Sequence, residues 1–194
     1  KDLYGEKSLH KLLRELCKIS GIQWIRILYC YPEEIYDELI ETIRDEKKIC
    51  HYLDLPIQHA SDSILKRMGR RTTESAIREM IAKLRREIPD LALRTTLISG
   101  FPGETEEEFA ESLAFAKEIG FGKVHVFAYS IRPGTRAAKM PNQLTNHQKE
   151  QRSHKMAEVT EQSRQEFLQS QVGKIESVLF ETQQSDGMQH GYTK

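Results

Sequence analysis

The sequence predicts an α/β protein: a parallel sheet with helical crossovers, followed by a long helix and the beginning of a separate β unit. Three observations support this prediction. Helix-forming and strand-forming segments alternate as far as Tyr129, the chain becomes polar and helical after Thr135, and the apolar segment "VGKIESVLFE" at 172–181 has no crossover helix behind it. Strands joined by long helical crossovers are parallel neighbours, and such crossovers are nearly always right-handed.

Apolar spacing predicts the elements of the first half. Residues 8–19, "SLHKLLRELCKI", place leucines at helical intervals behind Ser8, and "WIRILYCYP" at 24–32 is a β-rich segment that ends at Pro32. A second helix is expected at 33–46 and a short strand at 52–57. Residues 61–68 then form a short helix in this prediction, and residues 72–88 a longer one that Pro89 stops.

The second half repeats the alternation. After a strand at 91–99, Thr105 and Glu108 make a T-x-x-E capping box for a helix at 105–120, which ends at Gly120. A fourth strand at 123–129 precedes a long helix that starts after Pro141, with Thr145 or Asn146 as its cap. We expect the four strands, at 24–30, 52–57, 91–99 and 123–129, to be parallel neighbours in chain order.

Composition limits the possible classes of protein. The chain has 194 residues with 38% hydrophobic content, enough for one sizeable core. Its 29 basic and 29 acidic residues cancel, so global charge indicates no nucleic-acid partner. No window approaches the roughly 18 uninterrupted apolar residues of a membrane span, and the first residues lack the apolar segment of a targeting signal. A cytoplasmic protein without a membrane partner is therefore expected.

The three cysteines, Cys17, Cys30 and Cys50, are too far apart for a CxxC or CxxxCxxC metal loop, and three is an awkward number for a disulfide framework. They are interpreted as cytosolic thiols. Cys17 follows Leu13 by four residues on a helical apolar stripe, so we expect it to be buried. No metal site is predicted from these residues.

Two stretches follow strands and therefore lie where parallel α/β sheets bind ligands, beyond the carboxyl ends of the strands. In "ISGFPGE", Gly100 and Gly103 allow close approach of the backbone to a ligand, although a rigid capped turn explains the same residues. In "LPIQHASD", hydrogen-bonding side chains reach the same edge, although His59 also suits a structural role and Ser61 or Asp62 a helix cap.

A basic segment, "KRMGRR" at 66–71, follows the second of these stretches. A solvated basic face is the simpler interpretation, and contact with RNA phosphate or an acidic partner is the alternative.

Four segments resemble one family in order and spacing: "WIRILYCYPEEI", "YLDLPIQHASDSILKRMGRR", "LALRTTLISGFPGETEEEF" and "YSIRPGTRAAKM". The sequence is similar to the radical-SAM methylthiotransferases, the RimO/MiaB group, over nearly its whole length. The resemblance implies part of a TIM-barrel-like parallel barrel at 1–140, a linker helix at 141–170 and the start of a small β-barrel TRAM domain at 171–194.

The resemblance also implies an activity. In this family, S-adenosylmethionine and two [4Fe-4S] clusters insert sulfur at an unactivated C–H carbon and methylate it, with electrons from a donor. The barrel segments look most like the enzymes that modify an aspartate of ribosomal protein S12. "KEQRSHKMAEV" and "GYTK" look more like relatives that modify an adenosine of tRNA. A non-catalytic half-barrel that grips RNA or the ribosome is the alternative from another class.

By this resemblance, two strands line the S-adenosylmethionine pocket. Gln58 and Ser61 are expected near the ribose or methionine part, and Arg94 and Thr96 at other polar atoms of the cofactor. Ile98 and Gly100 are expected against adenine. No catalytic residue is assigned.

The sequence departs from the family pattern in one respect. The CxxxCxxC loop that holds the radical-SAM cluster does not occur in these residues, nor do the family's three further cluster cysteines. We therefore expect a fragment that is inactive alone, whose longer parent is the enzyme.

Overall fold

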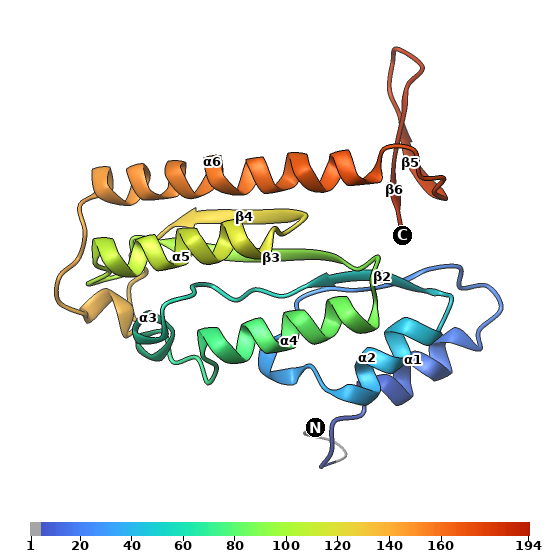
Figure 1. The fold of residues 1–194 in the computed structure, drawn as a ribbon, viewed down its shortest axis with the longest axis horizontal. Coiled ribbons are helices and arrows are strands. Elements are labelled where there is room, and N and C mark those ends of the chain that lie inside the picture. Colours follow the sequence, from blue (N-terminus) through green and yellow to red (C-terminus); the bar gives the residue numbers. More distant parts are fainter. Residues whose placement is uncertain (1–4) are drawn as a thin grey trace.

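The computed structural model describes residues 5–194, and its centre is a four-stranded parallel sheet (Figure 1). The strands pair in chain order, β1-β2-β3-β4, and every pair is parallel. The predicted order and direction are therefore confirmed. The strands are β1 (Ile25–Ile27), β2 (Ile49–Asp54), β3 (Ala92–Ser99) and β4 (Lys123–Ala128).

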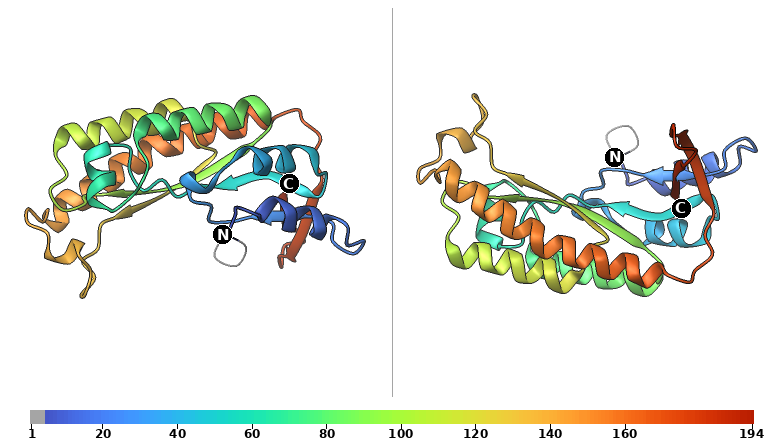
Figure 2. Two further views of the ribbon diagram at one scale, coloured as in Figure 1. Left: turned by 90° about the horizontal axis from the view of Figure 1, so that it is seen from below. Right: turned by 90° about the horizontal axis from the view of Figure 1, so that it is seen from above.

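Helices connect the strands and form the layer that covers the sheet. Figure 2 shows α4, α5 and α6 together on one side of β3 and β4. None of the helices within residues 5–194 combines the length and the apolar character needed to cross a membrane. The helices are α1 (Leu9–Cys17), α2 (Asp37–Asp45), α3 (Asp62–Arg67), α4 (Glu74–Glu87), α5 (Glu106–Ile119) and α6 (Asn146–Gln171), with short 3-10 turns at Pro32–Glu34 and Ala137–Lys139.

Alternation along β3 separates two faces of the sheet. Leu93, Thr95, Leu97 and Ser99 are buried, whereas the side chains between them are only partly buried. Because successive side chains of a strand point to opposite faces, one face packs in the core and the other does not. We call the second face, which carries Arg94, Thr96 and Ile98, the open face.

The predicted helix ends agree with the structure in three places. Thr105 and Glu108 form the predicted reciprocal capping box of α5. Gly120 ends that helix in the left-handed conformation, with φ of 61°. Thr145 caps α6, where the side chain of Gln148 completes a second capping box. Each box satisfies backbone N–H groups that the first helical turn leaves without partners.

Boundaries on the amino side differ from the prediction. The strand expected at 24–30 is limited to Ile25–Ile27, because the chain bends at Tyr29, whose φ is 58°. The helix expected from residue 33 starts only at Asp37, after a 3-10 turn. The strand expected at 52–57 lies at Ile49–Asp54, earlier by three residues at each end.

The long helix α6 is not an isolated connection, because it packs against β4 and α5. Its buried residues follow helical spacing, and four of the five are polar or charged. Two of them lie over aromatic rings: Nζ of Lys149 is 5.3 Å from the centre of the Tyr129 ring, and the guanidinium carbon of Arg152 is 5.4 Å from that of Phe109. The hydroxyl of Thr160 is satisfied within the helix by the carbonyl oxygen of Met156 at 2.9 Å.

The last segment forms a separate antiparallel hairpin of β5 (Val178–Gln183) and β6 (Gln189–Thr193). This agrees with the expectation of a β unit outside the parallel sheet. Two hydrogen bonds connect the hairpin's carboxyl end to the sheet region. Arg26 donates to the carbonyl oxygen of Thr193 at 2.6 Å, and Lys194 donates to that of Lys47 at 2.8 Å.

Gly100 provides a test of how tightly α6 packs. Its φ is 78°, and a Cβ there would lie 2.6 Å from Cγ and 3.1 Å from Cα of Lys149. Gly69 has nearly the same φ, 79°, with nothing within 4 Å. Gly69→Ala should therefore cost about 1 kcal/mol for backbone strain alone. Gly100→Ala should cost about 1–3 kcal/mol more, because overpacking is added.

Urea unfolding of both variants followed by circular dichroism measures the difference. Equal losses of unfolding free energy would show that α6 yields at this contact, contrary to the packing described.

Candidate functional site

The open face is built from residues that the parallel register places side by side. Asp54 is the partner of Arg94 on the neighbouring strand, and Arg94 is in turn the partner of Lys123. Two residues further along the same pair of strands, Thr96 pairs with His125. Register partners in a sheet point to the same face, so these side chains form one polar row across three strands.

Asp54 and Arg94 form the ion pair at the centre of this row, with 2.5 Å between Oδ2 and Nη1. Asp54 is fully buried, and its other oxygen, Oδ1, has no hydrogen-bond partner among residues 5–194. A buried carboxylate oxygen without a donor is costly. The geometry therefore suits a ligand that donates a hydrogen bond to Asp54 from an amine or hydroxyl.

Burial and the charges of this row shift the pKa values of Arg94 and His125. Burial lowers the pKa of Arg94, but the neighbouring Tyr52 and the carboxylate of Asp54 outweigh burial, so that pKa lies above its ordinary value. Burial lowers the pKa of His125, and the positive charges of Arg94 and Lys123 lower it further. At neutral pH the imidazole is therefore uncharged and can accept or donate one hydrogen bond.

A β-bulge lies just before Gln58, which bridges to Leu97 of β3. The parallel ladder continues beyond β2, where the N–H of Leu55 donates to the carbonyl oxygen of Arg94 and the N–H of Gln58 donates to that of Thr96. Three residue steps in the segment after β2 thus match two in β3. Pro56, which has no N–H to donate, lies within this longer stretch. Gln58 has φ of 73°, an unusual conformation for a side chain other than glycine. Such outliers cluster at functional sites.

Glu104 joins the two loops at the carboxyl end of the sheet. Its side chain is fully buried, and its Oε1 lies 2.9 Å from Nε2 of His59. Its Oε2 accepts from the N–H of Gly100 at 2.8 Å and from Arg152 at 2.6 Å. Because the N–H of Ser61 donates to Nδ1 of His59, the ring proton lies on Nε2 and is donated to Glu104.

The six residues predicted to bind a cofactor fall into two groups. Gln58, Thr96 and Ile98 are joined by backbone hydrogen bonds on the bulge, with Arg94 on the same face of β3. Ser61 and Gly100 belong to the Glu104 network, where Ser61 is buried before α3. The space beside Gly100 is filled by Lys149, so packing of α6 already explains a glycine there. Binding of a cofactor by these six residues stays a prediction.

Sequence reasoning missed Asp54, Glu104, His125 and Arg152. Each is an ordinary residue in its own segment, and only strand register or the docking of α6 brings it to the site. His59 is buried and hydrogen-bonded to Glu104, which fits the structural role that the sequence also allowed for it. A polar residue inside a strand that is otherwise apolar, as Asp54 is in "YLDLPI", was the available signal.

The basic segment at 66–71 is partly used in folding. Arg67 donates to the carbonyl oxygen of Pro102 and pairs with Glu108, both at the loop before α5. Arg70 donates to the carbonyl oxygen of Pro56 in the bulge. Two of its four cations therefore hold the site's loops in place.

The described residues do not form a metal centre. No group of three or more His, Cys, Asp or Glu side chains within residues 5–194 could hold a metal ion. Cys17 is only partly buried, contrary to expectation, and Cys50 is fully buried. Burial raises the pKa of Cys30 and Cys50, and Asp54 raises that of Cys30 further, so both remain thiols at neutral pH.

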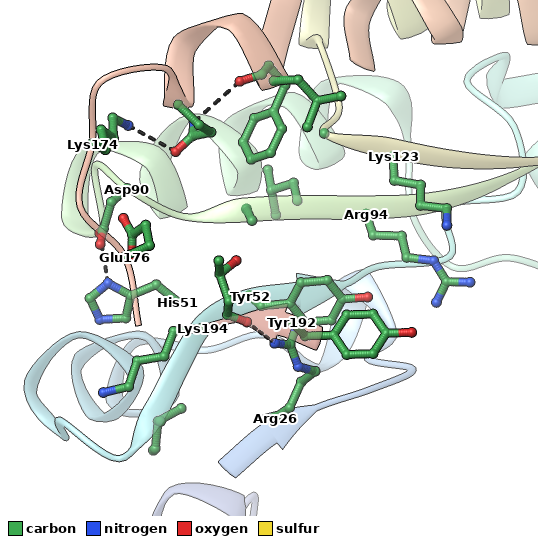
Figure 3. A pocket seen from close by; sticks show the side chains of 18 of the residues that line it. Arg26, His51, Tyr52, Asp90, Arg94, Lys123, Lys174, Glu176, Tyr192 and Lys194 are labelled. Carbon is green, nitrogen blue, oxygen red and sulfur yellow. Dashed lines mark hydrogen bonds and ion pairs between the residues drawn. The ribbon is translucent and has the colours of Figure 1, made fainter. Parts of the chain in front are cut away.

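A groove of about 860 Å³ opens at the other end of the sheet, beside the hairpin (Figure 3). Residues from the amino ends of β3 and β4, including Arg94 and Lys123, line one side. The hairpin contributes Tyr192 and Lys194. Arg94 thus lies between the open face and this groove.

Comparison with known proteins identifies the class. Residues 3–116, more than half of the chain, match the model of the Radical SAM superfamily. The chain therefore belongs to the Radical SAM superfamily. Among solved structures, coproporphyrinogen III oxidase (HemN) from Escherichia coli, described as a Radical SAM enzyme, is similar with a TM-score of 0.64 and 25% identity, over 83% of this chain and 38% of that one.

The particular relatives are more alike in sequence. The chain is 54% identical over 180 residues to ribosomal protein uS12 methylthiotransferase RimO of Lachnoclostridium phytofermentans, which covers 93% of this chain and 41% of the relative. It is 57% identical over 156 residues to the protein of that name from Geobacter sulfurreducens, covering 80% and 35%. The chain thus spans about two fifths of the length of these relatives.

The Glu104 network predicts a large difference between two neighbouring carboxylates. In Glu104→Gln, the amide NH2 group must face either the Nε2–H of His59 or the donors of Gly100 and Arg152, so donor faces donor in a buried site. Arg152 also loses the buried one of its two carboxylate partners. The unfolding free energy should fall by about 3–5 kcal/mol.

Glu106→Gln is the matched control, because Glu106 also pairs with Arg152 but its side chain is 77% exposed. Its cost should stay below about 1 kcal/mol. Similar losses for the two variants in denaturant titrations would contradict the role assigned to Glu104.

Proposed function

We propose that this chain is the carboxyl-side part of the catalytic barrel of a radical-SAM methylthiotransferase that modifies an aspartate of ribosomal protein uS12. The observation that carries this proposal is the 54% identity to a RimO protein over 93% of the chain. Such an enzyme works where ribosomes are, so we infer a cytoplasmic location. Within this proposal, residues 1–140 belong to the barrel, residues 141–170 link it onward, and residues 171–194 begin a TRAM domain.

The open face is the part of this chain that we assign to S-adenosylmethionine. The cofactor carries an amine, a carboxylate and ribose hydroxyls, and the row of Asp54, Arg94, Thr96 and His125 offers complementary groups. The unpartnered Oδ1 of Asp54 fits an amine or hydroxyl donor. Gln58 and Thr96 would orient polar atoms, and Ile98 would contact the adenine. Ser61 and Gly100 would shape the loops around it.

The iron–sulfur clusters are a different case. The described residues do not fit a [4Fe-4S] cluster, because no three candidate ligands converge and all three thiols have raised pKa values. We therefore propose that both clusters are held by residues outside this chain. This chain alone should therefore not cleave S-adenosylmethionine, because a cluster held outside it would have to supply the electron for that cleavage.

An adenosine of tRNA is the competing substrate, and a half-barrel that only grips RNA through residues 66–71 is the competing class. The high identity to RimO proteins favours the ribosomal protein. The segment at 66–71 has two of its cations engaged with the site's loops, so it offers a weaker RNA surface than its sequence suggests.

Mass spectrometry of a strain that lacks the complete gene tests this proposal. We expect uS12 to lose its methylthio group there while the methylthio groups of tRNA adenosines persist, and the intact gene to restore uS12. Loss of a tRNA modification with unchanged uS12 would instead identify the tRNA enzyme.

Two adjacent threonines test the assignment of the open face in the longer, cluster-loaded protein. Thr96→Val should weaken S-adenosylmethionine binding by about 0.5–1.5 kcal/mol, because a hydrogen bond to the cofactor is lost. Thr95→Val is the control, since Thr95 is buried on the opposite face, where its hydroxyl donates to the carbonyl oxygen of Leu55. Calorimetric affinities that change equally, or only in Thr95→Val, would remove Thr96 from the cofactor site.

A further inference from the structure

The groove at the amino end of the sheet concentrates positive charge in a chain whose net charge is zero. Two of its cations are neutralised by ion pairs, since Arg44 pairs with Asp45 and Glu87, and Arg94 pairs with Asp54. The remaining cations have no carboxylate partner within residues 5–194. These are Arg26, Lys47, Lys123, Lys174 and Lys194.

Acidic side chains do little to offset these charges. The groove has two, and Asp90 is already paired with His51 at 2.7 Å. Only Glu176 remains. Clustered cations in a concave surface raise the local concentration of an anionic partner.

Two tyrosines lie among the cations. Figure 3 shows Tyr52 of β2 and Tyr192 of the hairpin among the residues that line the groove, together with Arg26. The guanidinium of Arg26 lies 4.5 Å from the centre of the Tyr52 ring, and Tyr192 is 61% exposed. Aromatic faces bordered by cations are the arrangement on which the bases and phosphates of single strands bind.

The groove is separate from the proposed cofactor loops. Ala92 and Leu93, at the start of β3, line it, whereas Gly100 follows the last residue of that strand. Arg94 is the last residue of β3 that lines the groove, and Gly100 lies six residues beyond it, or roughly 20 Å at about 3.3 Å per residue. A partner in the groove would therefore leave the carboxyl-end loops accessible.

We propose that this groove binds single-stranded nucleic acid, with phosphates on the unpaired cations and bases on Tyr52 and Tyr192. This goes beyond the proposed function, which assigns the open face and the carboxyl-end loops to the cofactor. Arg94 is the one residue of that assignment that also lines the groove. An acidic peptide would match the cations equally well, but it would leave the exposed ring of Tyr192 without a stacking partner.

The test measures binding of a labelled RNA of about 12 nucleotides to the 194-residue chain by fluorescence anisotropy over a range of salt. The groove variant combines Lys47→Gln with Lys123→Gln. Its control combines Lys66→Gln with Arg71→Gln, which removes the same charge from exposed positions at the other end. All four side chains are exposed, so both variants should fold, and circular dichroism checks this.

We expect the groove variant to bind RNA about tenfold or more weakly at low salt, and its slope of log K against log salt to fall by about 1.4, for two lost phosphate contacts. The control should bind like the original chain. Equal weakening in both variants, or in neither, would overturn the proposal.

A third variant separates nucleic acid from acidic protein. Tyr192→Leu should weaken RNA binding by roughly fivefold or more, because a stacking face is lost, while binding of a labelled polyglutamate peptide stays unchanged. If polyglutamate binds more tightly than RNA, and Tyr192→Leu leaves RNA binding unchanged, the groove is a site for acidic peptides and the proposal is wrong.

Discussion

The buried carboxylate of Glu104 is the interaction on which the carboxyl end of the sheet depends. Burying a charge is costly unless it is paired and hydrogen-bonded on all sides. Its donors come from three separate places, His59 after β2, Gly100 after β3 and Arg152 in α6. None of these elements can move without leaving a buried donor or the carboxylate unsatisfied. The loops that flank the open face are therefore positioned jointly, and α6 takes part although it lies on the other side of the sheet.

The fold was predictable where local chemistry and topology agree. Helical crossovers require parallel neighbours, and Thr105, Gly120 and Thr145 mark helix ends through their own hydrogen bonds or backbone conformation. Prediction was wrong or absent at positions set by tertiary contacts. Tyr29 leaves the extended conformation, which ends the first strand early, and α6 buries Arg152, for which the sequence provided no expectation. An ion pair formed across 48 residues leaves no local pattern in the sequence.

Only part of the candidate site could be predicted from the sequence, because the rest is assembled by pairing between strands. Alternation along β3 and the resemblance to a family suggested Arg94, Thr96 and Ile98 on one face, and the structure places them there. Asp54 and His125 join them through strand register, which no single segment encodes. The same holds for the basic groove, whose five cations without a carboxylate partner come from five different segments. A chain with balanced composition can thus separate its charges in space.

The parallel order of the sheet also has a consequence for synthesis on the ribosome. Each strand pairs with the strand made just before it, so the ladder can grow from the amino end as the chain emerges. The carboxyl-end loops must wait, because Glu104 is translated 48 residues before Arg152, the cation that neutralises it. At about 5–20 residues per second this delay lasts roughly 2–10 s. During that interval the carboxylate must stay hydrated, and the nascent protein has a formed sheet whose carboxyl-end loops are still open to water.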